Sequence, residues 1–152
     1  MNPKAARIQI GQPMALAAEL LVLTQASDLM VVDDSNRFLG VLAEGDLLHA
    51  IMPDFEGLME AGASLQRAYG VFTGSGAYYA NQTIDRLVIR GSITLSPDDE
   101  LLKAATVMIT KGIRRLPVVE DERLLGSVSR ADLCWGVLVE QRRRDLTAAG
   151  AA

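Results

Sequence analysis

The feature that most constrains the fold of this chain is an internal repeat. Residues 29–47, LMVVDDSNRFLGVLAEGDL, align with residues 116–133, LPVVEDERLLGSVSRADL, with one gap opposite Asn36, and nine of the 18 aligned positions are identical. The similarity continues upstream, where residues 14–25 align with residues 101–112. Structural repeats bury their apolar faces against one another. The sequence therefore predicts two copies of one unit that pack together.

Composition and charge place the chain among ordinary globular proteins. Its 152 residues are 49% hydrophobic, 22% charged and only 5% aromatic, so the core must consist mostly of aliphatic side chains. The net charge is -4 and the pI is near 5.0. Nucleic-acid binding requires a basic surface, and the run Arg142–Arg144 is the only local exception to the acidic balance. We therefore expect no nucleic-acid partner.

The cysteine content and the hydropathy pattern bear on location. Cys134 is the only cysteine, which excludes an intrachain disulfide and a zinc site built on paired cysteines. No stretch reaches the ~18 consecutive apolar residues of a membrane span. We therefore expect a cytoplasmic protein without a membrane partner.

The second copy contains start and stop signals for a helix. Ser96 is a suitable N-cap, Pro97 suits the first helical position, acidic residues fill the first turn, and Gly112 would follow the last turn. These signals predict a helix from residue 97 to the residue before Gly112. The short apolar run 92–95, SITL, predicts a strand before it.

A hairpin and a terminal helix are expected next. The apolar runs 116–120 and 124–128 flank the polar turn 121–123, which is typical of a hairpin. Residues 130–144 return to helical spacing, and the basic run would be its solvated end. The side chains expected to pack from this helix are Leu133, Cys134, Trp135, Val137 and Leu138.

Each copy thus has the order strand, helix, strand, strand, helix, which predicts an α/β fold. We divide the chain into a diverged first repeat with a truncated start (7–52), an inserted segment (53–80), a second repeat (81–141) and a basic, then Ala-rich tail (142–152). The insertion has the composition for one or two helices, with a flexible break expected at TGSG before its end.

The order and duplication of these motifs resemble the cystathionine-β-synthase (CBS) domain. Residues 93–133 carry the helix, the LPVV strand and the Gly-x-x-Ser-x-x-Asp ending of such a domain, and residues 7–52 resemble a second one. The resemblance covers about two thirds of the chain. It implies a tandem CBS pair, a Bateman module, with the two β-α-β-β-α repeats packed as a pseudo-two-fold pair.

The resemblance also implies a function. Modules of this family are not themselves enzymes; they commonly bind adenosine-containing ligands in the cleft between two repeats, and they often dimerise into a flat disc. We therefore expect a non-catalytic regulatory homodimer that binds AMP, ADP or ATP, requires no other cofactor, and signals to an effector protein that the sequence does not reveal.

The expected ligand site lies where the last strand of the second repeat meets its helix. A helix N-terminus favours a phosphate, and Ser129 and Arg130 could add a hydroxyl donor and a charge. Asp132 has the chemistry to accept two hydrogen bonds from a ribose diol, and the resemblance gives it that role. Ser-x-x-Asp at a helix start is also close to a capping box, and the two interpretations can coexist.

The first repeat departs from this pattern. Ala43 replaces the serine and Glu44 replaces the arginine, whereas Asp46 is retained. Losing a hydroxyl partner costs about 1 kcal/mol, and an acid facing a phosphate would cost more. The sequence therefore predicts two unequal sites, with the one at Ser129 and Asp132 dominant.

Other ligand contacts are implied by the resemblance. Arg114, Arg115 and Pro117 stand at the LPVV strand, where residues of this family line the cleft, and Ile93 and Thr94 would face the adenine. Exposed arginines in a helix-to-strand connection and a plain core strand are the alternatives for these positions.

Two other function classes remain. A ligand-free dimerisation or protein-interaction scaffold is favoured by the degenerate first repeat. An enzyme is disfavoured because no nucleophile, base and orienting group can be assembled, and His49, the only histidine, has no catalytic partner in the sequence.

Overall fold

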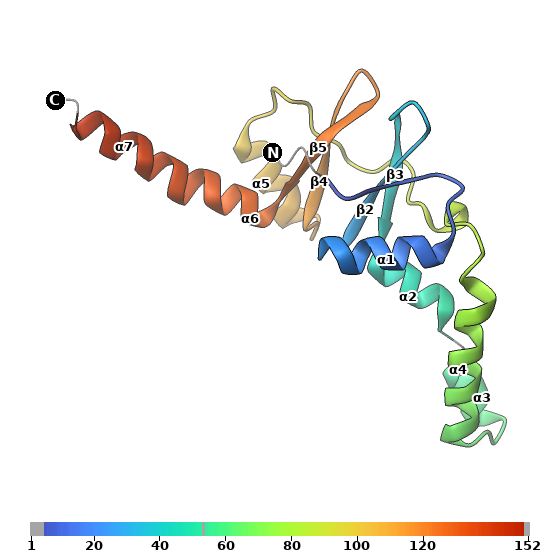
Figure 1. The fold of residues 1–152 in the computed structure, drawn as a ribbon. Coiled ribbons are helices and arrows are strands. Elements are labelled where there is room, and N and C mark those ends of the chain that lie inside the picture. The colour runs from blue at the N-terminus through green and yellow to red at the C-terminus, as the bar shows by residue number, and fades with distance from the viewer. Residues whose placement is uncertain (1–4, 53, 151–152) are drawn as a thin grey trace. The chain divides into compact units, whose positions relative to one another are not determined.

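The computed structural model describes residues 5–52 and 54–150 and is a mixed α/β structure (Figure 1). It divides into two compact units, one of residues 6–92 and one that contains Ala5 and the chain from residue 93 onward. Each unit is described by itself. None of the helices within the described ranges is long and apolar enough to cross a membrane.

The unit of residues 6–92 is built on a three-stranded sheet in the order β1-β2-β3. The strands β1 and β2 are parallel, and β2 and β3 form an antiparallel hairpin. Its core contains side chains from the strands and from the helices beside them. The elements are β1 (Arg7–Gln9), α1 (Met14–Thr24), β2 (Asp28–Val32), β3 (Phe38–Ala43), α2 (Glu44–Ile51), α3 (Phe55–Glu60), α4 (Leu65–Tyr79) and the 3-10 turn η1 (Asp85–Leu87).

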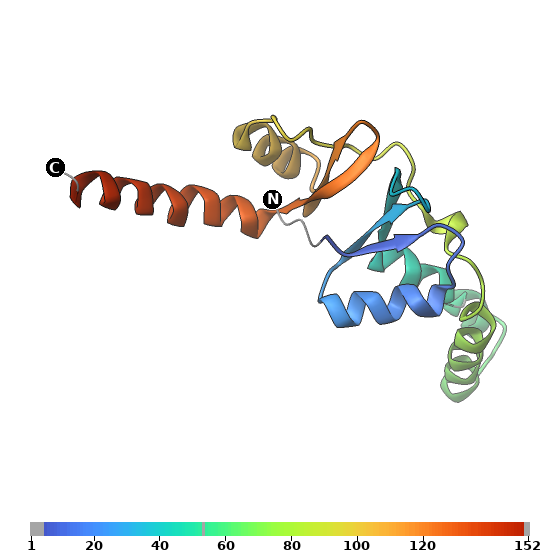
Figure 2. The ribbon, with the colours of Figure 1, turned by 45° about the horizontal axis from the view of Figure 1, so that its top comes forward.

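The insertion is helical, as the sequence predicts, but it lacks the expected break. The helix α4 runs unbroken through the TGSG stretch, where the hydroxyls of Thr73 and Ser75 donate to carbonyls one turn earlier. Figure 2 shows α3 and α4 side by side, in the same arrangement as Figure 1.

The segment that follows α4 packs with the first repeat. Ile84 is fully buried in the core of residues 6–92, and Ile89 exchanges two backbone hydrogen bonds with Val41, of 3.1 and 2.8 Å. By packing, the second unit therefore begins at residue 93, whereas the sequence places the start of the second repeat at residue 81.

The unit from residue 93 repeats the same local plan around the hairpin of β4 and β5. Asp121 and Glu122 both have positive φ, of 47° and 64°, and close the hairpin that the sequence predicts. The core lies between this hairpin, α5 and the first turn of α6. The elements are α5 (Leu101–Thr110), β4 (Arg115–Glu120), β5 (Arg123–Ser129), α6 (Arg130–Trp135), the π-helical turn η2 (Gly136–Glu140) and α7 (Gln141–Gly150).

Two sequence predictions for this unit are wrong at the level of the elements. Residues 92–95 do not form a strand; only Leu95 makes a parallel bridge to Val118, with a 2.8 Å hydrogen bond from its N–H to the Pro117 carbonyl. The helix begins at Leu101 rather than at Pro97.

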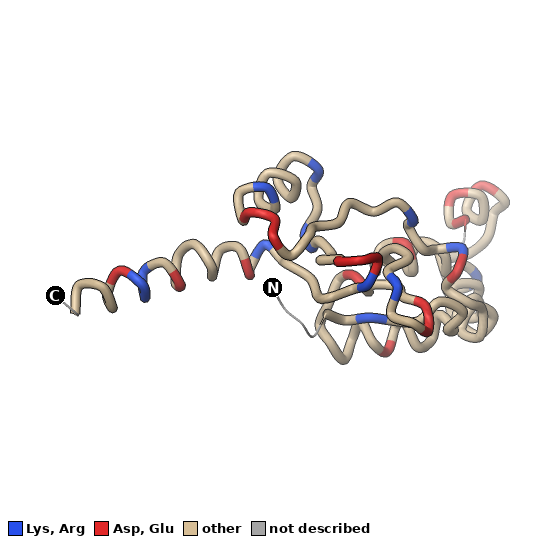
Figure 3. The backbone as a smooth tube through the Cα atoms, turned by 90° about the horizontal axis from the view of Figure 1, so that it is seen from above, with Lys and Arg blue, Asp and Glu red and all other residues tan. Residues whose placement is uncertain are grey.

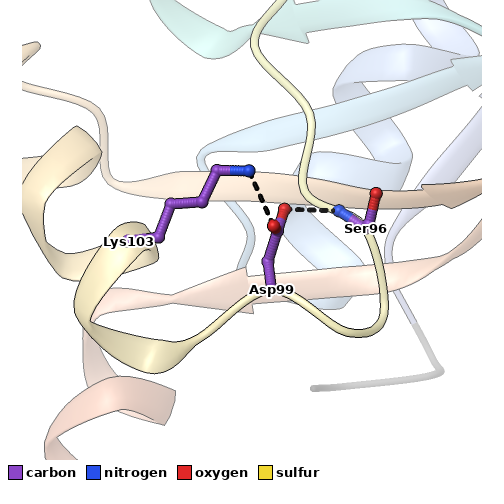
Figure 4. A network of polar contacts seen from close by, with 3 residues as sticks. All are labelled: Ser96, Asp99 and Lys103. Carbon is purple, nitrogen blue, oxygen red and sulfur yellow. Dashed lines mark hydrogen bonds and ion pairs between the residues drawn. The ribbon is translucent and has the colours of Figure 1, made fainter.

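A local polar network explains the late start of α5. The carboxylate of Asp99 accepts the Ser96 backbone N–H at 2.8 Å and the Lys103 ammonium at 2.6 Å (Figure 4). Asp99 therefore closes a separate turn back onto Ser96 instead of continuing the helix. The end of α5 is as predicted, because Gly112 follows it with a φ of 67°.

The terminal helix is longer and more exposed than predicted. α6, η2 and α7 follow one another directly, so the run Arg142–Arg144 lies within helical structure and not at its end. Only Leu133 of the expected packing residues is buried. The others are exposed, namely Cys134, Trp135, Val137 and Leu138.

Candidate functional site

The strand-to-helix corner of the second repeat is held by a capping box. The Ser129 N–H and hydroxyl donate to Oδ2 of Asp132 at 2.7 and 2.8 Å, and the Asp132 N–H donates to the Ser129 hydroxyl at 3.1 Å. The capping interpretation of the Ser-x-x-Asp motif is therefore confirmed. Oδ1 of Asp132 accepts no hydrogen bond from the described residues, so one carboxylate oxygen stays available to a ligand.

Arg130 is used within the fold. Its Nε donates to the Ile113 carbonyl at 3.0 Å, and a terminal nitrogen donates to the Met108 carbonyl at 3.1 Å. Met108 lies in the last turn of α5, where the carbonyls lack helical partners and favour a cation. The guanidinium therefore joins α6 to the end of α5, and a phosphate contact would require it to turn away.

The two corners share one backbone contact. The Arg130 N–H donates to the Arg114 carbonyl at 3.1 Å, and the Glu44 N–H donates to the Ser27 carbonyl at 2.9 Å. In each repeat the first helical amide is thus bonded to the residue before the hairpin. The duplicated sequence motif therefore forms a duplicated local structure.

The corner of the first repeat lacks the capping box. Ala43 is the N-cap of α2, and no side chain caps the helix. Asp46 is half-buried, and within the described ranges its carboxylate makes no hydrogen bond. The two corners therefore differ in their polar contacts.

The remaining candidate ligand contacts are divided between buried and exposed positions. Arg115 donates to the hydroxyl of the fully buried Ser127 at 2.8 Å, and Pro117 is also fully buried. Arg114, Ile93 and Thr94 are exposed, so the alternative of a plain core strand at residues 93 and 94 is wrong. All of these residues belong to the second unit, whereas Asp46 belongs to the first.

One contact of the corner, made by Arg130, could not be predicted from the sequence. The link between Arg130 and the end of α5 joins residues 22 positions apart, and no local pattern signals it. His49, for which the sequence offers no catalytic partner, is exposed on α2.

Comparison with known proteins identifies the family. The CBS domain model matches residues 1–53 and 84–137, which is more than half of the chain. The chain belongs to the CBS-domain family. The predicted family and the predicted α/β fold with two CBS repeats are confirmed, since solved CBS pairs match the structure along almost its whole length.

CBS proteins of several kinds are similar to this chain. CBSX2 in complex with AMP is 25% identical, with a TM-score of 0.69 and coverage of 93% of this chain and 94% of that one. A structure of CBSX2 from Arabidopsis thaliana has a TM-score of 0.74 at 23% identity, and 93% of each chain is covered.

Protein MJ1225 of Methanocaldococcus jannaschii is 24% identical over 76% of this chain and 33% of its own length. The inosine-5'-monophosphate dehydrogenase of Thermoplasma acidophilum is 41% identical over 49 residues, which are 32% of this chain and 10% of the enzyme. The chain therefore spans a third or less of these two curated relatives.

Proposed function

We propose that this CBS pair is a non-catalytic regulatory module that binds an adenosine nucleotide, AMP, ADP or ATP, and passes the bound state to a partner protein in the cytoplasm. The observation that carries the proposal is the duplicated strand-to-helix corner with an aspartate in the first turn of each helix. The AMP complex of CBSX2, a CBS pair that resembles this chain over 93% of its length, supports the choice of ligand.

The two corners would bind unequally. The capping box fixes the Asp132 carboxylate and leaves Oδ1 to accept from a ribose hydroxyl, so little ordering is required on binding. Asp46 has no such support within the described residues and would have to be ordered by the ligand. We therefore propose that the second repeat carries the stronger site.

Regulation would follow from linkage. A ligand shifts an equilibrium between two arrangements only by its differential affinity for them. A partner that recognises one arrangement would then respond to the nucleotide concentration. Arg114, Arg115, Ile93 and Thr94 are the further proposed contacts, and Pro117, which is fully buried, would support them from beneath. Ser129 would approach the phosphate, and Arg130 would do so once it turns away from the Met108 and Ile113 carbonyls.

Calorimetric titration of the full chain with AMP, ADP and ATP tests the proposal. Asp132→Asn keeps one acceptor oxygen for the capping box, replaces the other oxygen with an amide donor and removes the charge. We expect it to weaken binding about tenfold or more, as loss of a charged hydrogen-bond partner does. Asp46→Asn is the matched control and should have the smaller effect. If none of the three nucleotides binds, the sensor proposal fails; a larger effect of Asp46→Asn would move the dominant site to the first repeat.

A homodimer is the second part of the proposal. Large apolar side chains are exposed on α1, α2 and α5, and such surfaces are typical of interfaces. They include Val22, Leu23, Leu48, Leu102 and Ile109. Sedimentation of the full chain with and without nucleotide measures dimerisation, and the calorimetric titration measures nucleotide binding. A dimer that binds none of the three nucleotides would be a ligand-free scaffold and not a sensor.

A further inference from the structure

The helical insertion forms an apolar groove that the proposed nucleotide function does not use. Side chains from the end of α2 and from α3 and α4 surround a cavity of about 480 Å³. We call it the insertion groove. It is lined by Met52, Phe55, Leu65, Ala68, Tyr69 and Phe72.

The insertion groove is open, and the helix α3 that forms part of it carries exposed acidic residues. Leu65 and Tyr69 are each 68% exposed, although both side chains are large and apolar enough to favour burial. Asp54, Glu56 and Glu60 are exposed along α3, and Arg67 on α4 is the one basic residue between 53 and 80. An occupant of this groove should therefore combine an apolar face with positive charge.

The C-terminal helix of the same chain has these properties. Trp135, Leu138 and Leu146 are 50%, 69% and 63% exposed on the continuous helical segment of α6, η2 and α7. The contact of Arg143 with the Trp135 ring, and the three-residue spacing from Arg143 to Leu146, place Trp135 and Leu146 on the same side of this segment. We call these three residues the C-terminal stripe. No residue of α7 is buried, and Figures 1 and 2 show α7 extending away from β4, β5 and α5 of its own unit.

The positive charge lies beside the stripe. Arg142–Arg144 occupy the helix between Leu138 and Leu146, and the Arg143 guanidinium lies 6.0 Å from the centre of the Trp135 ring. In the sequence, Glu140 and Asp145 stand on either side of the three arginines. Figure 3 shows the basic positions of this helix in blue and its acidic positions in red. Arg144 and Glu140 form an ion pair that is long at 3.9 Å and exposed, so it stabilises the helix little.

We propose that the insertion groove binds the C-terminal helix of a second copy of this chain. The C-terminal stripe would fill the apolar groove. Arg142 and Arg143, which lie four and three residues before Leu146 and so on the same side of α7, would face the acidic residues of α3. A helix laid into a hydrophobic groove is a recurrent mode of recognition, and complementary charge fixes its orientation and partner. Each chain carries one groove and one helix, so a reciprocal exchange would cover both surfaces in both copies.

The sole tryptophan gives a direct test. Because Trp135 belongs to the C-terminal stripe, its emission should lie at shorter wavelength in concentrated solutions of the full chain and move to longer wavelength on dilution, in step with the mass measured by sedimentation. Tyr69→Ser, at an exposed position, should raise the dissociation constant of this contact about tenfold or more.

Tyr78→Ser is the matched control, since Tyr78 lies on the same helix and is 66% exposed but does not line the groove. It should leave the concentration dependence unchanged. A dimer formed only through other surfaces would respond equally to both tyrosine variants, and that result would overturn the proposal.

Charge reversal gives an independent test. The variant with Glu56→Arg and Glu60→Arg, and the variant with Arg142→Glu and Arg143→Glu, should each lose the concentration-dependent shift, and a mixture of the two should regain it. Failure of the mixture to recover would refute the pairing. Two other results would also overturn the pairing. If the chain is monomeric and its emission does not respond to dilution, the groove is filled by the chain's own helix. If the emission shifts only on addition of phosphatidylserine vesicles, the helix binds a membrane surface.

Discussion

The contrast between the two strand-to-helix corners predicts opposite effects of two reciprocal substitutions. Ser129→Ala removes the acceptor for the Asp132 N–H and the hydroxyl that donates to its carboxylate, and leaves only the backbone bond of 2.7 Å to Oδ2. Loss of an N-cap costs about 1 kcal/mol, within a range of about 0.5–2. We therefore expect Ser129→Ala to lower the free energy of unfolding of the second unit by about 1–2 kcal/mol.

Ala43→Ser should do the reverse in the first unit. Ala43 has φ -88° and ψ 146°, close to the -102° and 167° of Ser129, so the backbone is already in the geometry of a capping residue. Asp46 occupies the position of Asp132, three residues into the motif. A serine at position 43 should therefore form the same capping box and raise the free energy of unfolding by about 1 kcal/mol.

Denaturant unfolding and amide exchange measure both effects. Trp135 emission follows the second unit, and circular dichroism follows the helices of both. For a unit of this size, about 1 kcal/mol corresponds to roughly 4–8 °C in Tm. Exchange should become faster at the Asp132 amide in Ser129→Ala and slower at the Asp46 amide in Ala43→Ser. Unchanged exchange at both amides would refute the assignment of these corners as capped and uncapped.

Two further predictions concern contacts elsewhere in the fold. The hydrogen bond from the Lys103 ammonium, and after it the one from the Ser96 N–H, hold the pKa of Asp99 below its usual value, so the ionised carboxylate stabilises the fold above the ordinary aspartate pKa and this stabilisation is lost as the pH falls through the lowered pKa. Lys103→Ala should raise the Asp99 pKa toward 3.8 in an NMR titration. An unchanged pKa would contradict the contact. Gly40→Ala should destabilise the first unit by about 1–3 kcal/mol in thermal unfolding, because the new Cβ would collide with the Ile89 carbonyl oxygen. A Tm equal to that of the parent chain would show that the segment around Ile89 does not pack on β3.

The internal repeat allowed much of the architecture to be predicted. Apolar runs around a short polar turn predict the hairpin of β4 and β5, because strand pairing there is local. Gly112 predicts the end of α5 because a left-handed backbone conformation is easiest for glycine. These signals depend on a few neighbouring residues, so the sequence alone can reveal them.

Errors arose where two local solutions compete. Ser96, Pro97 and the acidic residues after them suit a helix start, but the same carboxylate chemistry lets Asp99 close a turn onto Ser96. The glycines of the TGSG stretch suggest a break, yet hydrogen bonds to the preceding turn keep α4 continuous. Propensity describes the options, and the surrounding contacts select one of them.

The sequence predicted part of the candidate site, and the structure added the rest. The motif Ser-x-x-Asp identifies the corner from the sequence, and the absence of the serine in the first repeat identifies the inequality of the two corners. The structure adds that Arg130 is bonded to Met108 and Ile113 and that one oxygen of Asp132 supports the cap. A motif specifies which groups are present, but their bonding depends on which backbone groups come near them.

The sequence by itself determined the family, the duplicated unit and the position of its strand-to-helix corners, because repeat identity, hairpin formation and helix capping are encoded within short stretches of chain. Only the tertiary structure decided that Ile84 enters the core of the first repeat. It also decided that the side chains of Trp135 and Leu138, which were expected to pack against the fold, are exposed. Burial depends on which surfaces meet after the elements have formed, and that information lies in contacts between residues far apart in the chain.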